Sequence, residues 1–257
     1  MSKIDKYLHN QSSSYFEEEL FEPNESDVNY LICKSLLEIK QLTKSAIGGH
    51  HFDQNAQNIF LDNLSSAGFN LIEHKDWMKN YKDYRQRVLE CSNNGVPYDF
   101  SNIETSNILD RVIIDKPNGA NNYPDILIIF NNTGMGFECK TNAKDSVSWG
   151  MTIPHDNIIY LFNSYRKIGK STFFLGSDLI NKEERFLLEQ FQKFFKFHAK
   201  EANEHLKKTK SSWKTNVNLI WSNTHKLFGN ESDRQQKENK VLEFVKNFKW
   251  RTQKKSK

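Results

Sequence analysis

The 257-residue sequence has little of what marks several common protein classes. No apolar run approaches the roughly 20 residues that cross a bilayer, and the opening residues, MSKIDKYLHNQSSS, lack the apolar core of a signal peptide. Only three cysteines are present, Cys33, Cys91 and Cys139, and none belongs to a CxxC pair. These absences argue against a membrane protein, a disulfide scaffold and a structural zinc site, and they predict a cytoplasmic protein.

The sequence also lacks a GxxxxGK[ST] phosphate-binding loop, internal repeats and any linker rich in proline, glycine or serine. A chain of this length can bury one sizeable core. We therefore expect a single domain over residues 1–257, with its core at about 48–180 and a basic helical region at 181–257.

The net charge of +4 is unevenly distributed along the chain. Residues 181–257 hold 19 lysines and arginines against 9 aspartates and glutamates, whereas the rest of the chain holds 17 against 23. A basic C-terminal third predicts contact with a polyanion, with nucleic acid as the first candidate. A solvated, lysine-rich helical surface is the alternative interpretation.

Hydrophobic spacing predicts helices toward both ends of the chain and strands between them. Helices are expected at 26–47 with Ser26 as the cap, at 52–67 before Gly68, at 74–93, at 181–209 and near 231–249. Strands are expected at 111–115, 125–130, 135–140, 157–162, 171–176 and 216–221. The turn NNTG at 131–134 predicts an antiparallel hairpin. The fold class is α/β, a mixed central sheet flanked by helices.

The expected helix at 181–209 carries one strongly apolar side. Its members are Phe186, Leu187, Phe191, Phe194, Phe195 and His198. Such a stripe on a helix usually faces the core. We therefore expect these phenylalanines to pack inside the protein rather than to stack on bases.

Charged residues interrupt the expected hairpin. Because side chains alternate along a strand, Glu138 and Lys140 share one face, and Asp125 opens the neighbouring strand beside Glu138. Two close carboxylates are stable when a hard cation such as Mg²⁺ takes their oxygens, and a nearby lysine orients a water or a phosphate oxygen. This set of residues predicts phosphodiester hydrolysis. An exposed Glu138–Lys140 pair, with Asp125 as a turn residue, is the alternative.

Pro124-Asp125, twelve intervening residues and Glu138-Cys139-Lys140 resemble the PD-(D/E)XK pattern of the restriction-endonuclease-like nucleases. Residues 110–180 more narrowly resemble bacterial type II restriction endonucleases. The resemblance implies that Asp125 and Glu138 bind Mg²⁺ together with the backbone carbonyl of Cys139, and that Lys140 assists the attacking water. It further implies a restriction-endonuclease-like catalytic core, double-stranded DNA as the substrate, and a homodimer.

The same resemblance implies further site residues. An acidic or amide residue often comes from a preceding helix, and Asp53 is the candidate here, with Gln54 as the alternative. The loops around the catalytic strands are expected to contact DNA. The candidates are Asn118, Asn122, Tyr123, Lys144, Ser146, Ser148 and Trp149. Each of these could instead be an ordinary loop residue, and Trp149 could simply pack.

Two other functions remain open from the sequence. One is a structure-specific or repair nuclease with the same metal site and a different DNA substrate. The other is a non-catalytic domain that binds DNA or a partner and uses its acidic strand residues in salt bridges.

Overall fold

The computed structural model describes residues 27–43, 51–103, 108–119, 122–150, 153–156, 158–166, 168–215, 221–222 and 226–251. The helices are α2 (Val28–Lys40), α3 (Phe52–Leu64), η1 (Ser65–Ala67), α4 (His74–Asn80), α5 (Lys82–Asn94), η2 (Gly176–Asp178), α6 (Lys182–Lys208) and α7 (Glu231–Lys246). The strands are β1 (Asn70–Ile72), β2 (Tyr98–Asp99), β3 (Val112–Asp115), β4 (Ile126–Phe130), β5 (Thr133–Asn142), β6 (Ser148–Gly150), β7 (Ile159–Ser164), β8 (Lys170–Leu175) and β9 (Trp221–Ser222).

A seven-stranded mixed sheet forms the centre of the protein, in the order β1-β3-β4-β5-β7-β8, with β2 paired to the start of β5. The pairs β1–β3 and β5–β7 are parallel, and the pairs β3–β4, β4–β5 and β7–β8 are antiparallel. Strands β6 and β9 form a separate two-stranded ribbon. The predicted α/β class with a mixed sheet between helices is confirmed.

The predicted hairpin at 131–134 is confirmed as the β4–β5 pair. Asn131 and Asn132 have φ of 48° and 57°, so both central residues of the two-residue turn are in the left-handed region. Asparagine tolerates this conformation, and such turns match the twist of the strands they join. The turn fixes the register at Phe130↔Thr133, and Ile126 consequently pairs with Phe137.

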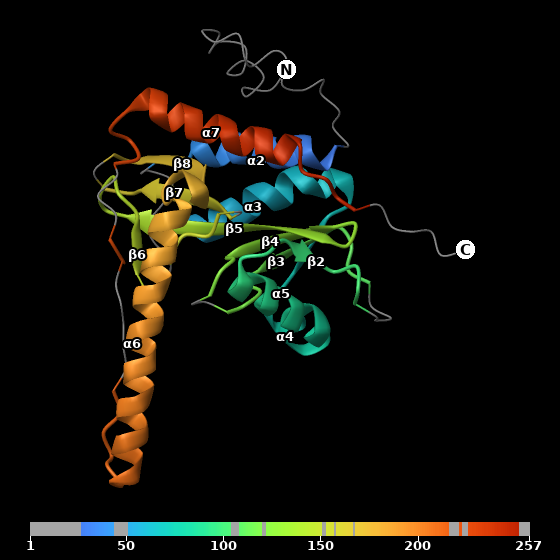
Figure 1. Cartoon of the computed structure of the whole chain (residues 1–257). Coiled ribbons are helices and arrows are strands. Elements are labelled where there is room, and N and C mark those ends of the chain that lie inside the picture. The colour runs from blue at the N-terminus through green and yellow to red at the C-terminus, as the bar shows by residue number, and fades with distance from the viewer. Residues whose placement is uncertain are drawn as a thin grey trace.

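Helices cover both faces of the sheet (Figure 1). Helices α2, α3 and α7 pack on one face, against buried strand residues that include Ile113, Ile128 and Phe137. Helices α4 and α5 cover the other face near β2, β3 and β4, where Ile114 and Leu127 are buried. Residues 113 and 114 thus point to opposite sides, as the two-residue period of a strand requires.

Two predicted helices differ from those observed. The first begins after Asp27, which accepts a hydrogen bond from the amide of Asn29 at 2.8 Å, so Asp27 rather than Ser26 is the cap. Ser26 lies outside the described residues. The helix predicted at 74–93 is two helices, α4 and α5, which meet at Tyr81. Most of the strand predicted at 216–221 also lies outside the described residues.

The prediction that the α6 phenylalanines pack in the core is wrong. Helix α6 spans 27 residues and extends away from the sheet as an arm (Figure 1). None of its described side chains is buried, and Phe186 and Phe194 are 60% and 57% exposed. The helix is as amphipathic as predicted, but the described part of the protein does not cover its apolar side.

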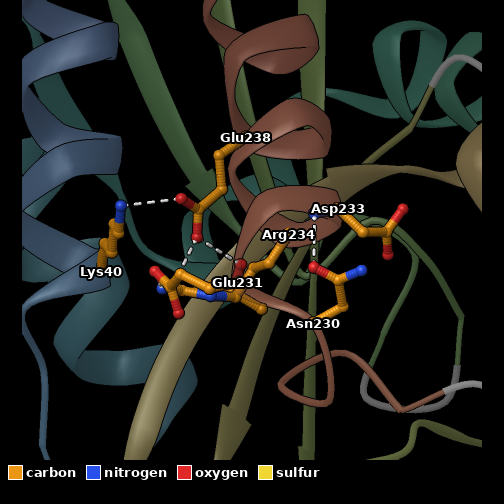
Figure 2. A network of polar contacts seen from close by, with 7 residues as sticks. Lys40, Asn230, Glu231, Asp233, Arg234 and Glu238 are labelled. Carbon is orange, nitrogen blue, oxygen red and sulfur yellow. Dashed lines mark hydrogen bonds and ion pairs between the residues drawn. The ribbon is translucent and has the colours of Figure 1, made fainter. Parts of the chain in front are cut away.

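Helix α7 is held to the sheet by a buried polar network (Figure 2). Glu238, only 2% exposed, accepts a hydrogen bond from the hydroxyl of Thr172 on β8 at 2.6 Å. Its other partners are Lys40 of α2 at 2.7 Å and Arg234 of α7 at 2.9 Å. A buried carboxylate is tolerated when it is paired and hydrogen-bonded in this way.

None of the helices in the described ranges combines the length and the apolar character that crossing a bilayer demands.

Candidate active site

Strands β4 and β5 bring the predicted catalytic residues together. Asp125 immediately precedes Ile126, whose partner across the hairpin is Phe137, so Asp125 lies beside Glu138. Glu138 and Lys140 project from the same face of β5, as the strand period predicted, and Lys140 Nζ lies 2.7 Å from Glu138 Oε1. A carboxylate–carboxylate–lysine group is thereby formed where the start of β4 lies beside the middle of β5.

Asp125 is fixed by the backbone of the opposite strand. Its Oδ2 atom accepts a hydrogen bond from the amide of Cys139 at 2.8 Å. Gly136 lets this corner close, because a Cβ there would lie 3.2 Å from Pro124 and 2.9 Å from the ring of Tyr98. Because Gly136 has no side chain, the Pro124-Asp125 segment can pack directly against β5.

The two acids lack full compensation within the described residues. Burial, and after it the neighbouring charge of Glu138, raise the pKa of Asp125 to about 7, although the amide of Cys139 and the charge of Lys140 oppose the shift. Glu138 is 7% exposed, and its Oε2 atom is buried with no hydrogen-bond partner in the part of the chain that is described. An unpaired buried carboxylate oxygen costs free energy unless a further partner compensates it.

Asp53 of α3 belongs to the same electrostatic environment. Its charge contributes to the raised pKa of Asp125 and of the Cys139 thiol. Burial alone would raise the pKa of Asp53, but an ion pair with Lys116 at 2.7 Å brings it below its usual value. Gln54, the alternative candidate, is exposed and donates hydrogen bonds along its own helix to Gln57 and Asn58. Asp53 is thus the better placed of the two.

The donor set fits Mg²⁺ binding by a small number of protein oxygens. The described residues contain no group of three or more histidine, cysteine, aspartate or glutamate side chains arranged to hold a metal. Mg²⁺ usually keeps several waters and takes one or two carboxylates together with substrate phosphates. The unpartnered Oε2 of Glu138 and the half-used carboxylate of Asp125 match that requirement.

An aromatic wall lines the Glu138 side of the site. Tyr123 packs on the ring of His155, with 4.5 Å between centroids, and burial raises the pKa of its hydroxyl, as do the nearby charges of Tyr98 and Glu138. Burial and the charge of Arg185 lower the pKa of His155 to about 4, so this histidine is neutral at physiological pH. A neutral, buried His155 fits a packing role better than that of a proton acceptor.

Arg185 enters this wall from the start of α6, outside the core predicted at 48–180. It forms an ion pair with Asp156 at 2.5 Å, and its Nε is buried without a hydrogen-bond partner among the described residues. The charge of Arg185 partly opposes the increase that burial causes in the pKa of Tyr123 and of Tyr160, so both tyrosines lie close enough to feel it. The positive charge at the start of α6 therefore acts on the tyrosines beside Glu138.

The seven residues predicted to contact DNA differ in their exposure. Asn122, Lys144 and Ser148 are exposed, and contact with DNA stays a prediction for them. Trp149 is 4% exposed and packs edge-on against Tyr160, which is the packing alternative that the sequence left open.

The other three members of the set are tied into the protein. The side-chain amide of Asn118 donates to Ser92 Oγ at 2.9 Å and to the carbonyl of Tyr123 at 2.8 Å. Ser146 is half-buried, and its carbonyl accepts from Asn142 at 2.7 Å. Asn118 therefore shapes the loop that leads into Asp125 rather than facing solvent.

No family model, curated protein or solved structure matches the chain. The geometry of the site and the motif that it contains are therefore the basis for inferring a function.

Lys116 and Arg185 are the charged groups of this site that were not among the sequence-predicted candidates. Lys116 directly follows β3, and its signal in the sequence was only a position in the polar loop before Asp125. Arg185 had no local signal, because its place beside the site depends on how α6 leaves the sheet.

Proposed function

We propose that the chain is a Mg²⁺-dependent endodeoxyribonuclease that cuts both strands of DNA, in the manner of type II restriction endonucleases. One observation carries the proposal. Asp125 and the Glu138-x-Lys140 pair, separated in sequence, meet at one end of the β4–β5 hairpin as an acid pair that the described residues leave short of positive charge.

The residues of the site then take distinct roles. Asp125, Glu138 and the carbonyl of Cys139 would hold Mg²⁺, which supplies a more acidic bound water and neutralises charge on the phosphate. Lys140, held at 2.7 Å by Glu138, orients the attacking water or a phosphate oxygen. The Asp53–Lys116 pair lies at the edge of this group and sets its local charge.

The distribution of charge supports DNA as the substrate. Residues 181–257 carry 19 basic residues against 9 acidic ones, and the exposed Lys144 follows directly from the catalytic strand. Basic side chains that neutralise phosphates account for most non-specific DNA affinity, which falls steeply as salt increases. The acid pair alone would repel DNA, so this positive charge and the cation are both needed.

Incubation of the purified protein with unmethylated phage DNA tests the proposal. We expect discrete fragments in Mg²⁺, none in EDTA, and a loss of at least about a hundredfold in cleavage rate for Lys140→Ala, because a positioned charge at the reacting phosphate is worth that much. Lys79→Ala, an exposed lysine of α4, is the matched control and should cut as the wild type does.

The other outcomes separate the remaining functions. Mg²⁺-dependent attack on branched or mismatched DNA, with intact linear DNA left uncut, would indicate a structure-specific nuclease instead. Absence of any cleavage, together with equal DNA binding by wild type and Lys140→Ala, would show that the site is not catalytic.

A further inference from the structure

A row of exposed lysines runs along one side of helix α6. At 100° per residue, its members lie within about 60° of one another around the helix. The lysine row consists of Lys193, Lys196, Lys200 and Lys207. Within the described chain none of them forms an ion pair, not even with Glu189 or Glu204 on the same side of the helix. Ion pairs therefore do not neutralise the positive charge of this row.

The positive charge continues into the tip of the arm, residues 209–215. No acidic residue occurs in the sequence between Glu204 and Glu231, and residues 205–215 hold four lysines. Trp213 lies among these lysines and is 80% exposed, more than any other large hydrophobic residue of the described chain. Nucleic-acid surfaces combine aromatic rings and lysines in this way, because the rings pack on bases or sugars and the lysines neutralise phosphates.

The tip is an anchored turn. The amide of Ser211 donates to the carbonyl of Leu206 at 3.0 Å and closes the end of the helix. The side-chain amide of Asn203 donates to the carbonyl of Thr215 at 2.8 Å, and the amide of Thr215 donates to Asn203 Oδ1 at 2.8 Å. Trp213 is therefore presented from a turn that is fixed to the helix on both sides.

The lysine row borders a shallow hollow where the chain returns beside the helix at Thr215. The hollow has a volume of about 390 Å³. Its lining includes Lys196, Lys200 and Lys207, with Glu204 as an acidic member. Lysine binds phosphate oxygens as a point charge, so three lysines around one opening favour a ligand that carries phosphates.

The lysine row lies on the side of α6 that is turned toward the candidate active site. Arg185, whose charge acts on the tyrosines beside Glu138, is only about 20° from Lys196 around the helix. From Lys182 the helix continues for 27 residues, about 40 Å, away from the sheet (Figure 1). At about 3.4 Å per base pair, a duplex that passes the acid pair and follows this side reaches the tip about 12 base pairs further on.

Lysines and a tryptophan also suit an anionic membrane surface. The position of the row favours nucleic acid instead, because the row extends from a carboxylate–carboxylate–lysine group whose chemistry suits a phosphodiester. A polymer that carries phosphates past this group meets the lysine row next.

We infer that the lysine row and the tip of α6 bind the backbone of double-stranded DNA, with Trp213 packed against the duplex about 12 base pairs from the acid pair. The choice of DNA rests on the proposed nuclease function, whereas the contact itself is measured by binding and needs no cleavage. The arm adds affinity outside any recognised sequence, because phosphate contacts carry no sequence information directly.

Fluorescence anisotropy of a labelled duplex of about 32 base pairs, titrated with salt in EDTA so that nothing is cut, tests the lysine row. In Lys196→Gln/Lys200→Gln/Lys207→Gln we expect a dissociation constant at least about tenfold higher at low salt. The slope of log affinity against log salt should become smaller by about 2–3, because each phosphate contact contributes about 0.9 to it.

A matched control removes the same charge elsewhere. Lys75→Gln/Lys79→Gln/Lys82→Gln replaces three exposed lysines of α4 and α5 and should bind within about twofold of the wild type. Circular dichroism shows whether each variant keeps its helix content.

A duplex of about 8 base pairs tests the reach of the arm. It is too short to contact the acid pair and the tip at once, so the loss caused by the triple arm substitution should shrink from at least about tenfold to less than about threefold. An equal loss on both duplexes would overturn the shared duplex, because the arm would then bind DNA separately from the acid pair.

Two substitutions test the tryptophan. Trp213→Ala should weaken binding to the long duplex at least about fivefold, and Trp213→Phe, which keeps an aromatic ring, by less than about threefold. An unchanged affinity of Trp213→Ala would exclude Trp213 from the contact.

Two results overturn the inference as a whole. One is a triple arm variant that binds the long duplex as tightly as its α4–α5 control. The other is an arm variant that loses binding to vesicles of phosphatidylserine and phosphatidylcholine in equal parts but not to DNA, which would assign the surface to a membrane. Either result leaves the proposed function in place if DNA is still cut in Mg²⁺. Arm-dependent binding without any cleavage would keep this contact and remove the nuclease.

Discussion

The protein contains two groups of buried acids, and they differ in the partners that surround them. Glu238 of α7 is surrounded by Lys40, Arg234 and Thr172, all within 2.9 Å (Figure 2). Asp125 and Glu138 have one amide and one lysine between them, and Glu138 Oε2 has no hydrogen-bond partner in the described chain. Glu238 Oε2 is also without a hydrogen bond in the described chain, but it forms an ion pair with Lys40 at 2.7 Å, so the Glu238 carboxylate has three partners where Asp125 and Glu138 share two.

The difference separates a structural group from a candidate functional one. At Glu238 the protein supplies all the positive charge, which ties α2, α7 and β8 together. At Asp125 and Glu138 the described residues supply one amide and one lysine, and the pKa of Asp125 is raised because burial and the charge of Glu138 disfavour its ionised form. Sites built for ligands are often less stable than they need be for folding alone.

Removing the complete network should have the largest effect on stability. Glu238→Ala removes the buried acceptor of Arg234 and Thr172 and leaves Arg234 with the exposed carboxylate of Glu231, so we expect a loss of about 3–5 kcal/mol in the free energy of unfolding. Urea denaturation followed by circular dichroism measures it. Glu90→Ala, which breaks the surface pair with Arg87, should cost under about 1 kcal/mol. Equal losses in the two variants would show that the network is not structural.

Neutralising Asp125 should have the opposite effect and stabilise the metal-free protein. Because the folded pKa of Asp125 is about 7 against an ordinary 3.8, its ionisation destabilises the metal-free protein progressively as the pH rises from about 4 to 7. We expect Asp125→Asn to be more stable than wild type by about 1–3 kcal/mol at pH 8 without metal, and equal or less stable at pH 4. Unfolding curves at both pH values measure the difference. A variant less stable than wild type at pH 8 would contradict the raised pKa.

The Asp53–Lys116 pair should show the smallest effect. Both side chains are roughly 30% exposed, so solvent screens the pair and Lys116→Met should change the free energy of unfolding by less than about 1 kcal/mol. The pKa of Asp53 should nevertheless rise, because burial is then no longer opposed by the lysine. NMR titration of the carboxyl group measures this. An unchanged pKa in the variant would mean that the ion pair does not form in solution.

The sheet and the acid pair could be predicted because their signals are local. Short runs of β-branched and aromatic residues define β3, β4, β5, β7 and β8, and the turn residues Asn131 and Asn132 fix the hairpin. Once the hairpin is set, Asp125 must lie beside Glu138, and Lys140 must share its face. The short strands β1, β2 and β6 were missed because two or three residues carry no periodic pattern.

The remaining features depend on long-range contacts that spacing does not encode. The break between α4 and α5 is at Tyr81, and no proline or glycine at that point signals a helix end. The Lys116–Asp53 pair joins residues far apart in sequence. Helix α6 had the pattern of a core helix, but an amphipathic pattern states only that a face needs covering, not whether the same chain covers it.

A cation site at Asp125 and Glu138 can be tested by titrating Mg²⁺ against the thermal stability of wild type and Asp125→Asn at pH 8. We expect Mg²⁺ to raise the melting temperature of the wild type and to leave that of Asp125→Asn nearly unchanged, because ligand binding to the native state stabilises it by mass action. Glu238→Gln should respond to Mg²⁺ as the wild type does. Equal responses in wild type and Asp125→Asn, or no response in either, would contradict a cation site at the acid pair.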